Sequence, residues 1–284
     1  MQVLGSKIKE ARKAAHLSQA ELAKGICTQA TISNIESRNT CDSLDIFSQV
    51  CMRLGVDVND FLVPSEEQKF NEFLDVIEDK CNHLKYKEAF KMLQDYSNPI
   101  PHHNSLLLDK YNYYHGITSL LGVKDSSEAL FYLYQGAEIK DKVNIYNIMS
   151  DNAIGTMYAL EKKMDRAKIY HDKSVKMLAE YGREIPKMAY KVFYDSSNFY
   201  SQHGDYKKSL KLCEQGIKLN KENNSSFYLE QLLYEVAFNK QMLGQDAKQD
   251  YIFAYYYAKF KGNKSIADAA LKDMETHSIS FDDK

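Results

Sequence analysis

The chain has 284 residues, 44% of them hydrophobic, and a formal net charge of −2; a sizeable core is therefore possible, and the whole chain lacks the basic excess that would by itself indicate nucleic-acid binding. Only 4 Pro and 12 Gly interrupt it and Trp is absent, so helix breakers are rare and a helical protein is expected. No apolar run reaches transmembrane length, and Met1 is followed at once by a charged amphipathic segment, so the sequence predicts neither a membrane span nor a signal peptide.

The first 62 residues show the apolar spacing of five short helices. Polar residues at the expected helix starts are N-cap candidates, namely Ser18, Thr28 and Ser43, and the segment SQAE that begins at Ser18 fits the capping-box pattern. Gly55 is expected to end the fourth helix in the left-handed conformation. Residues 56–62 are expected to form the fifth helix, which would complete a compact bundle.

A short turn, Ile26–Cys27, separates the expected second helix, Gln19–Gly25, from the third, Thr28–Ser37. The third helix must then cross the second at a large angle, and this turns its polar face outward. Gln and Asn can bond two groups on an adenine edge, Thr or Ala can touch a thymine methyl, and Gln19 is placed to bond a phosphate. The expected DNA-binding residues are Gln19, Thr28, Gln29, Ala30, Thr31, Ser33, Asn34 and Arg38.

The charge of this segment is uneven. Residues 1–41 carry six Lys or Arg against three Glu, whereas residues 42–62 carry one Arg against four Asp. One end of the expected bundle is therefore basic, as docking on phosphates requires.

The segment LSQAELAKGICTQATISNIESR resembles the helix-turn-helix of the phage-repressor and Cro-like family, and the resemblance covers residues 5–62. It implies a sequence-specific DNA-binding domain, with a bundle used only for protein interaction as the alternative. Arg38 and Asn39 stand where the family usually has a Gly-containing turn, and Asn tolerates the left-handed conformation.

Residues 64–68, PSEEQ, break this pattern and start a new helix with Ser65 as its expected cap. We therefore expect a DNA-binding domain over residues 1–63, a linker and the start of a linker helix over 64–72, and a second domain over 73–284.

Residues 68–277 are almost entirely helical by periodicity and contain an internal repeat of about five units, ending near residue 263. Each unit has two helices, and a small residue follows each intervening turn at a spacing of roughly 40 residues. These small residues are Ala89, Ala129, Ala167 and Ser209. The fifth unit has Gln249 instead, as an atypical terminal repeat often does.

The repeat is similar to tetratricopeptide repeats, which place a Gly or Ala, then a Tyr three residues on, and a small residue in the next helix. The segments Gly155–Tyr158 and Ser197–Tyr200 keep these intervals, and Gly116 keeps its interval to Ala129 with one extra residue. The resemblance implies an all-α chain, in which a five-helix helix-turn-helix domain precedes a right-handed α-solenoid of about five tetratricopeptide-like helix pairs.

In such a solenoid the first helices of successive pairs line the concave face. An Asn amide there can donate to and accept from one peptide unit, Tyr provides apolar walls with a polar tip, and Lys110 and Lys191 could pair with carboxylates. The expected peptide-binding residues are Lys110, Tyr113, Asn152, Thr156, Lys191, Tyr194, Asn198, Ser201, Gln231 and Tyr234. The alternative is that they are ordinary wet surface residues and core tyrosines.

Catalytic and metal-binding motifs are not expected. The five cysteines (27, 41, 51, 81 and 213) form no C-x-x-C pair and have no His at zinc-ligand spacing, so we interpret them as reduced, mostly buried thiols of a cytoplasmic protein. The sequence has no H-E-x-x-H, P-loop, G-x-S-x-G or dinucleotide fingerprint. We predict no catalytic residue, no metal and no cofactor.

Together the two halves resemble the peptide-pheromone-responsive transcription regulators of the Rgg, PlcR and PrgX group. The resemblance implies a cytoplasmic homodimer that binds double-stranded operator DNA and is controlled by a short signalling peptide on the concave face, with no membrane partner. The alternative is a DNA-tethered interaction module, of a repressor or antitoxin-like kind, whose repeats bind a partner protein.

Overall fold

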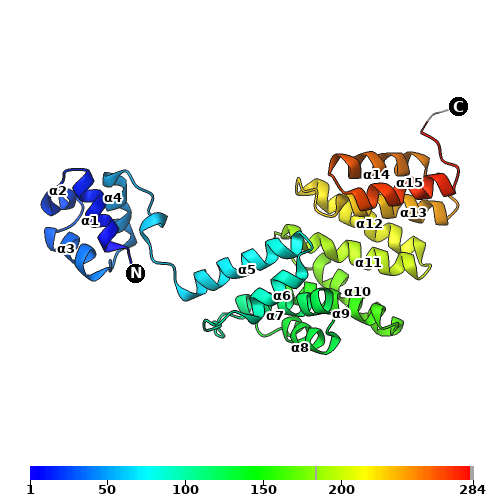
Figure 1. Ribbon diagram of the computed structural model, residues 1–284, viewed down its shortest axis with the longest axis horizontal. Helices are drawn as coiled ribbons and strands as arrows, with labels where there is room; N and C mark the ends of the chain where they lie inside the picture. Colours follow the sequence, from blue (N-terminus) through cyan, green and yellow to red (C-terminus); the bar gives the residue numbers. More distant parts are fainter. Residues whose placement is uncertain (183, 282–284) are drawn as a thin grey trace. The chain divides into compact units, whose positions relative to one another are not determined.

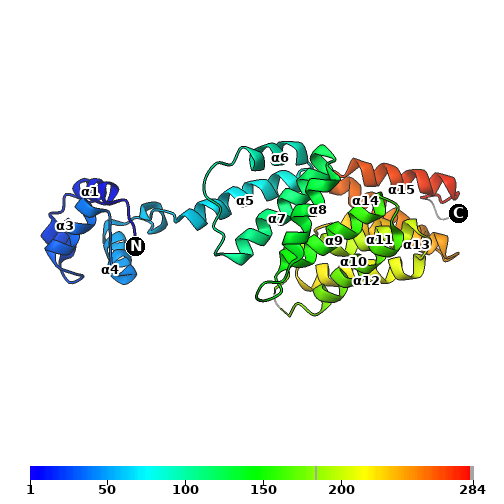
Figure 2. The same ribbon diagram turned by 90° about the horizontal axis from the view of Figure 1, so that it is seen from below.

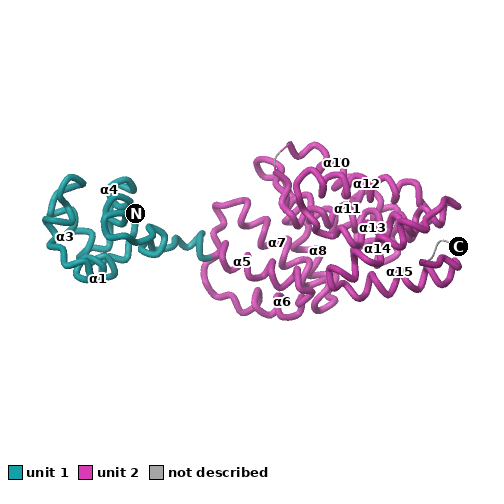
Figure 3. The backbone as a smooth tube through the Cα atoms, turned by 90° about the horizontal axis from the view of Figure 1, so that it is seen from above, with its two compact units in different colours: residues 1–69 teal, residues 70–284 magenta. Residues whose placement is uncertain are grey.

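The computed structural model describes residues 1–182 and 184–281, and within these ranges it is helical apart from two isolated β-bridges, Gln2↔Thr40 and Val3↔Leu62. Figures 1 and 2 show the helices in two views. The chain divides into two compact units, residues 1–69 and 70–284 (Figure 3). No helix among the described residues is long and apolar enough to cross a membrane.

The first unit contains four α-helices and one turn of 3-10 helix. These elements are α1 (Gly5–Ala14), α2 (Gln19–Ala23), α3 (Gln29–Arg38), α4 (Leu44–Leu54) and η1 (Asn59–Phe61). Ser18 and Glu21 form the predicted capping box, Thr28 and Ser43 cap α3 and α4, and Gly55 ends α4 at φ 69°.

The predicted fifth helix over residues 56–62 is wrong in extent, because only the 3-10 turn η1 forms. The Asp57 carboxylate accepts a hydrogen bond from the backbone N–H of Asn59 and starts this turn. The chain then becomes extended at Leu62, and the Val63 N–H donates to the Gln2 carbonyl at 3.1 Å. Pairing with the N-terminal segment thus ends the helix early.

Asn39 joins α1 to the end of α3. It adopts the predicted left-handed conformation, with φ 56°, and its side-chain oxygen also accepts a hydrogen bond from the Gly5 N–H at 3.1 Å. A Cβ at Gly5 would lie 2.1 Å from the Ile35 carbonyl oxygen, so only glycine allows α1 to start against α3. The substitution of Asn for the family's usual Gly therefore adds a contact as well as preserving the turn.

The second unit is built from consecutive helix pairs. The helices are α5 (Glu66–Asn82), α6 (Tyr86–Gln94), α7 (Ser105–Thr118), α8 (Ser126–Ala137), α9 (Ile145–Leu160), α10 (Met164–Ala179), α11 (Lys191–Gln202), α12 (Tyr206–Glu222), α13 (Leu229–Met242), α14 (Lys248–Phe260) and α15 (Lys264–Thr276). Ser65 caps α5, since its hydroxyl accepts from the Gln68 N–H at 3.2 Å. Helices α5 to α14 follow one another as five helix–turn–helix units, as predicted. The two helices of each unit from α7/α8 to α13/α14 pack closely together, and α15 packs on α14.

The predicted small residues lie where helices approach each other closely. Ala89, Ala129, Ala167 and Ser209 are fully buried. A Cβ at Gly116 would lie 2.6 Å from Leu133 Cγ, so α7 and α8 could not pack this closely with a larger residue there.

The extra residue between Gly116 and Ala129 is accommodated by a π-helical turn, η2 (Ser119–Val123), at the end of α7. Single residues inserted into a helix are commonly absorbed in this way. The Thr118 hydroxyl donates to the Tyr114 carbonyl at 2.7 Å, and the Ser119 hydroxyl donates to the His115 carbonyl at 2.8 Å. The irregular interval in the sequence therefore leaves the packing of this repeat unchanged.

Candidate nucleic-acid interface and candidate ligand cleft

Helix α3 has one buried face and one exposed face within the first unit. Ile32 and Ile35 are buried in the core of that unit. Most of the predicted DNA-binding residues lie on the outer face: Thr28, Gln29, Ala30, Asn34 and Arg38 are exposed, and Thr31 and Ser33 are half-buried. The outer face is thus polar and open, as a helix that enters a DNA groove must be.

A chain of polar contacts connects the exposed face of α3 to the core. Gln29 Nε2 donates to Gln19 Oε1 at 2.6 Å, and Gln19 Nε2 donates to Glu36 Oε2 at 2.9 Å. Glu36 in turn accepts from Arg12 Nε at 2.6 Å. The Gln19 amide, expected at a phosphate, is thus engaged with Gln29 and Glu36, and it holds the Gln29 side chain in one orientation.

The charges in this chain are mutually stabilised. Burial alone would raise the pKa of Glu36, but hydrogen bonds from Arg12 and Gln19 and the Arg12 charge outweigh it and lower that pKa. The hydrogen bond from Glu36 raises the pKa of Arg12. The pair therefore stays ionised and braces α1 against α3.

The second unit contains two adjoining narrow cavities, with free volumes of about 20 and 10 Å³, which we call together the inner cleft. Tyr113, Ile117, Met149 and Lys191 line both cavities, and Asn152 lines the smaller one. These residues come from α7, α9 and α11, the first helices of three successive pairs. The structure thus brings three predicted peptide-binding residues, Tyr113, Asn152 and Lys191, to one cleft.

The inner cleft combines an ion pair with tyrosine walls. Burial would lower the pKa of Lys191, but the charge and hydrogen bond of Asp195, one turn further along α11, outweigh it and raise that pKa. Burial raises the pKa of Tyr86, another lining residue, to about 12. The cleft therefore holds one charged pair among neutral phenols.

Asn152 connects the cleft to a buried polar cluster behind it. Its Nδ2 lies 3.0 Å from Ser196 Oγ, 3.1 Å from Ser174 Oγ and 3.2 Å from His171 Nδ1. Burial lowers the pKa of His171 to about 3, so its ring is neutral. These contacts link α9, α10 and α11, so that any shift of Asn152 is felt by all three helices.

The remaining predicted peptide-binding residues lie outside the inner cleft. Lys110 is buried against α5, where it pairs with Asp75 and donates to Asn71 Oδ1 at 3.2 Å. Thr156 donates to the Asn152 carbonyl at 3.3 Å.

Four others line neighbouring surfaces of α11 and α13. The Tyr194 ring stacks on Tyr228, with ring centroids 5.5 Å apart. Asn198 Nδ2 donates to the buried Glu235 at 3.0 Å, Ser201 is buried, and the Tyr234 hydroxyl donates to Asp273 of α15 at 2.8 Å. Gln231 lines a separate, larger groove.

Ile117 and Met149, which helical spacing also places on the concave face, line the inner cleft. The lining residues that were not predicted are Cys81, Asn82, Tyr86, Tyr114, Ala153, Met188, Val192, Asp195 and Tyr228. Tyr86 and Tyr228 lie next to turns, and Met188 lies in the 3-10 turn η3 (Lys187–Tyr190). Helical spacing counts only the regular concave positions, so it could not find them.

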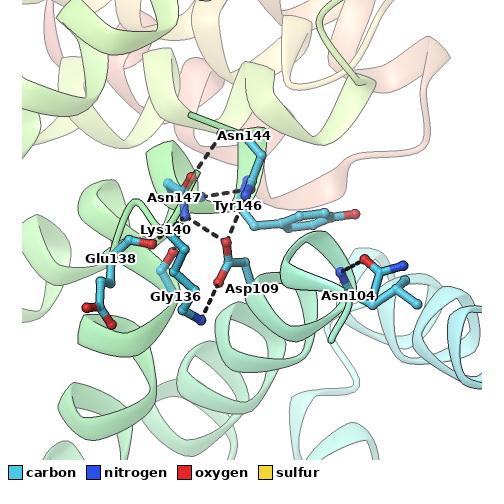
Figure 4. A network of polar contacts seen from close by, with 9 residues as sticks. Asn104, Asp109, Gly136, Glu138, Lys140, Asn144, Tyr146 and Asn147 are labelled. Carbon is cyan, nitrogen blue, oxygen red and sulfur yellow. Dashed lines mark hydrogen bonds and ion pairs between the residues drawn. The ribbon is translucent and has the colours of Figure 1, made fainter. Parts of the chain in front are cut away.

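A second buried network fixes the start of α9 (Figure 4). Asp109 of α7 accepts hydrogen bonds from Asn144 Nδ2 at 2.8 Å, Asn147 Nδ2 at 3.0 Å and Lys140 Nζ at 3.4 Å. Asn144 and Asn147 also form the capping box of α9, and Asn147 Nδ2 donates to the Gly136 carbonyl at 2.8 Å. The network holds in place the helix that carries Met149 and Asn152 to the cleft.

The described residues contain no group of three or more His, Cys, Asp or Glu side chains that could hold a metal ion. All five cysteines are free; Cys27 is half-buried and the others are buried.

Known proteins resemble both the helix-turn-helix domain and the fold of the whole chain. Residues 8–61 match the model of the helix-turn-helix family. No curated protein matches the chain. Among solved structures, Bacillus thuringiensis PlcR in complex with the peptide PapR7 and DNA is similar with a TM-score of 0.67 and 20% identity, over 95% of this chain and 99% of that chain.

Two streptococcal regulators are similar over the same length. ComR from S. thermophilus, in complex with DNA and its signalling peptide ComS, has a TM-score of 0.58 and 16% identity over 96% of this chain and 99% of that chain. The SHP pheromone receptor Rgg2 of Streptococcus dysgalactiae has a TM-score of 0.56 and 14% identity, also over 96% and 99%.

These findings confirm the predicted fold class and the predicted resemblance at the level of the fold. The chain is all-helical, with a helix-turn-helix domain followed by paired helices like those of PlcR, ComR and Rgg2. The matched domain family and the matched regulators are not enzymes, in agreement with the prediction from the sequence.

Proposed function

We propose that this chain, with its helix-turn-helix domain and its PlcR-like fold, is a cytoplasmic transcription regulator that binds operator DNA and is controlled by a short signalling peptide. The observation that carries the DNA half is the exposed polar face of α3, on which Gln29 is held by Gln19. The observation that carries the peptide half is the meeting of Tyr113, Asn152 and Lys191 at one cleft.

For DNA, we propose that the outer face of α3 enters the major groove. Gln29 and Asn34 have the amide groups that pair with an adenine edge, and Ala30 and Thr31 offer methyl groups to thymine. Arg38, at the exposed C-terminal end of α3, is suited to a phosphate. Ser33 and the Thr28 end of the helix complete the proposed contact surface, with Gln19 acting through Gln29.

For the peptide, the inner cleft offers what an extended backbone requires. Asn152 supplies an amide, the tyrosines supply apolar walls with polar tips, and the Lys191–Asp195 pair can exchange its internal partner for a charged group of the ligand. Lys110, Thr156, Tyr194, Asn198, Ser201, Gln231 and Tyr234 remain proposed contacts further along the concave face.

We propose that the peptide acts by changing the relative positions of α9 and α11. A ligand that touches Asn152 and Lys191 touches both helices, and the Asn152 cluster joins them to α10. If the peptide binds one curvature of the solenoid better than another, it shifts the population toward that curvature.

We also propose that the chain works as a homodimer, because a two-fold operator requires two recognition helices at a set spacing. Helix α14 offers a surface for the second copy. Phe253, Tyr256 and Phe260 lie on one face of α14 and are 57%, 55% and 86% exposed. Sedimentation equilibrium tests this: Phe260→Asp should shift the population toward monomer, and an unchanged dimer would place the interface elsewhere.

The DNA half is tested by selection of random double-stranded DNA with the purified full chain. Enrichment of a two-fold sequence supports the proposal, and the absence of any enriched sequence contradicts it.

The peptide half is tested by affinity selection from a library of short synthetic peptides, followed by calorimetry on the selected peptide. Asn152→Ala and Asn198→Ala should weaken binding, whereas Asn223→Ala, at the exposed position directly after α12, should not. If both test variants bind as the wild type does, the groove assignment is wrong. Copurification of a protein in place of any peptide would favour the partner-binding alternative.

A further inference from the structure

The inner cleft is narrow, and its deepest lining residues are buried. Tyr113, Ile117 and Met149, which line both of its cavities, are only 3–4% exposed. A ligand that contacts these side chains cannot reach them unless some part of the wall moves.

Beside the inner cleft lies a larger space of about 490 Å³, which we call the outer groove. It is lined by residues 79, 82–84, 226–228 and 230–231, and by Lys261 and Asn263. Asn82 and Tyr228 line both the outer groove and the inner cleft. These two residues therefore form the wall between the two spaces.

Of the two, Tyr228 has the larger side chain and the more constrained backbone. It precedes α13 with φ 55°, in the left-handed region, and its side chain makes no capping hydrogen bond. A bulky residue at positive φ is strained and persists only where its surroundings hold it. The Tyr228 ring is held by stacking on Tyr194, with an interplanar angle of 23°.

The turn that carries Tyr228 has a second residue of the same kind. Asn224 has φ 48°, so the connection between α12 and α13 contains two non-glycine residues in the left-handed region. A change of the Tyr228 backbone out of the left-handed region would relieve its strain and would move its ring off Tyr194. The turn is therefore suited to two conformations.

The chemistry behind Tyr228 indicates what the inner cleft admits. Ile117, Met149 and Met188 provide apolar, adaptable walls. The charges of Lys191 and Asp195 are already paired with each other. An entering charged side chain would have to leave water without a free partner, whereas an apolar one would lose nothing.

We propose that Tyr228 is a gate that admits one large apolar side chain of the ligand from the outer groove into the inner cleft, while the ligand backbone stays in the outer groove. The identification of the ligand as a peptide rests on the proposed function. The gate itself does not, and it is tested first without any peptide.

Cys81 is a built-in reporter of the gate, because it lines the inner cleft and is buried. Its labelling by N-ethylmaleimide is followed by mass spectrometry, with the buried Cys213 of α12 as the internal control. Tyr228→Asn removes the ring but tolerates the left-handed backbone, and Tyr228→Phe keeps the ring.

Tyr228→Asn should accelerate labelling of Cys81 by about tenfold or more, as local opening does, with Cys213 unchanged and with Tyr228→Phe close to the wild type. An unchanged Cys81 rate in a Tyr228→Asn variant with wild-type circular dichroism would overturn the gate. A parallel rise at Cys213 would overturn it too, because it would report general loosening.

The side-chain class is tested by NMR of ¹³C-methyl-labelled methionines, with N-acetyl-leucine amide and N-acetyl-aspartate amide as probes. Met149 and Met188 report on the inner cleft, and the exposed Met52 is the control. The leucine probe should shift both cleft signals, more strongly in Tyr228→Asn, and the aspartate probe should shift neither. Equal responses to both probes, or none to either, would overturn the apolar class. If Cys81 and the methionines respond as expected but the peptide library yields no binder, the proposed function fails and the gate stands.

Discussion

The two units use buried polar groups differently. Within residues 1–69, all of which the structure describes, Arg12 is the only polar or charged residue that is buried as a whole, and the side chain of its partner Glu36 is 3% exposed. The second unit buries many, among them Asp109, Asn147, Asn152 and His171. The first unit therefore presents its candidate functional groups outward from an apolar core, whereas the second keeps them inside.

Function and stability are therefore separable in the first unit and coupled in the second. A polar residue on the outer face of α3 can change without disturbing the core of its unit. A polar residue of the second unit is part of the packing between helices, so its replacement changes stability and ligand binding together.

In the first unit Glu36→Ala should be the exception, because it removes one partner of a buried ion pair. It leaves the Arg12 guanidinium, whose side chain is 11% exposed, without its partner, and breaking a buried pair costs about 3–5 kcal/mol. Thermal unfolding should show loss of the first unit, with the second unit unaffected. The double variant Arg12→Met/Glu36→Leu should recover much of the loss, and an unchanged melting temperature in Glu36→Ala would contradict the assigned role.

Asp109→Ala should destabilise the second unit by about 2–3 kcal/mol, because the amides of Asn144 and Asn147 lose their shared acceptor while buried. Chemical denaturation monitored by circular dichroism measures the change. Asp141→Ala, at an exposed position in the loop between α8 and α9, is the matched control. Equal stability of the two variants would show that the network does not brace α9.

The second unit should also lose stability as the pH falls from about 6.5 toward 4, at an order of 1–2 kcal/mol per buried histidine. Burial lowers the pKa of His115 to about 4 and that of His171 to about 3. At these two positions the unfolded chain therefore binds a proton in this window and the folded chain does not, so protonation of the histidines favours unfolding. His16, the single histidine of residues 1–69, is exposed, so the first unit should be less sensitive above about pH 5.5, before the Glu36 carboxylate becomes protonated in the unfolded chain. His171→Gln should shrink the effect, and an identical pH response of both units would refute it.

Gln29→Ala should have the smallest effect on the protein and a specific one on binding. It should cost about 1–3 kcal/mol at one base position of the selected DNA, with no change in the melting temperature. Gln49→Ala on α4 is the control, since its side chain bonds to Asp45 within the same helix. Equal losses on every DNA sequence would indicate a phosphate contact instead of base reading.

Much of the first unit could be predicted because its signals are local. The caps at Ser18, Thr28 and Ser43, and the left-handed residues Asn39 and Gly55, depend on hydrogen bonds and dihedral angles within a few residues. The Gln19–Gln29 and Arg12–Glu36 contacts join different helices, and no spacing rule predicts them.

In the second unit, periodicity predicted the helix pairs and the concave positions of Tyr113, Asn152 and Lys191, which line the inner cleft. It could not predict that Lys110 is engaged by Asp75 of α5, because that pairing depends on how α5 packs against α7. Periodicity could not predict Tyr228 as a lining residue either, because it lies outside any helix, at a position set by a turn with left-handed residues.

The π-helical turn η2 shows that the length of a repeat can change at one place without changing its contacts. It holds one surplus residue between Gly116 and Ala129, and both of these still pack where the shorter units pack theirs. Deletion of the exposed Leu121 should therefore leave an ordinary helical turn and a sound repeat. An alignment of this chain with a distant relative can therefore place a one-residue gap at this turn and keep the same helix register on both sides of it.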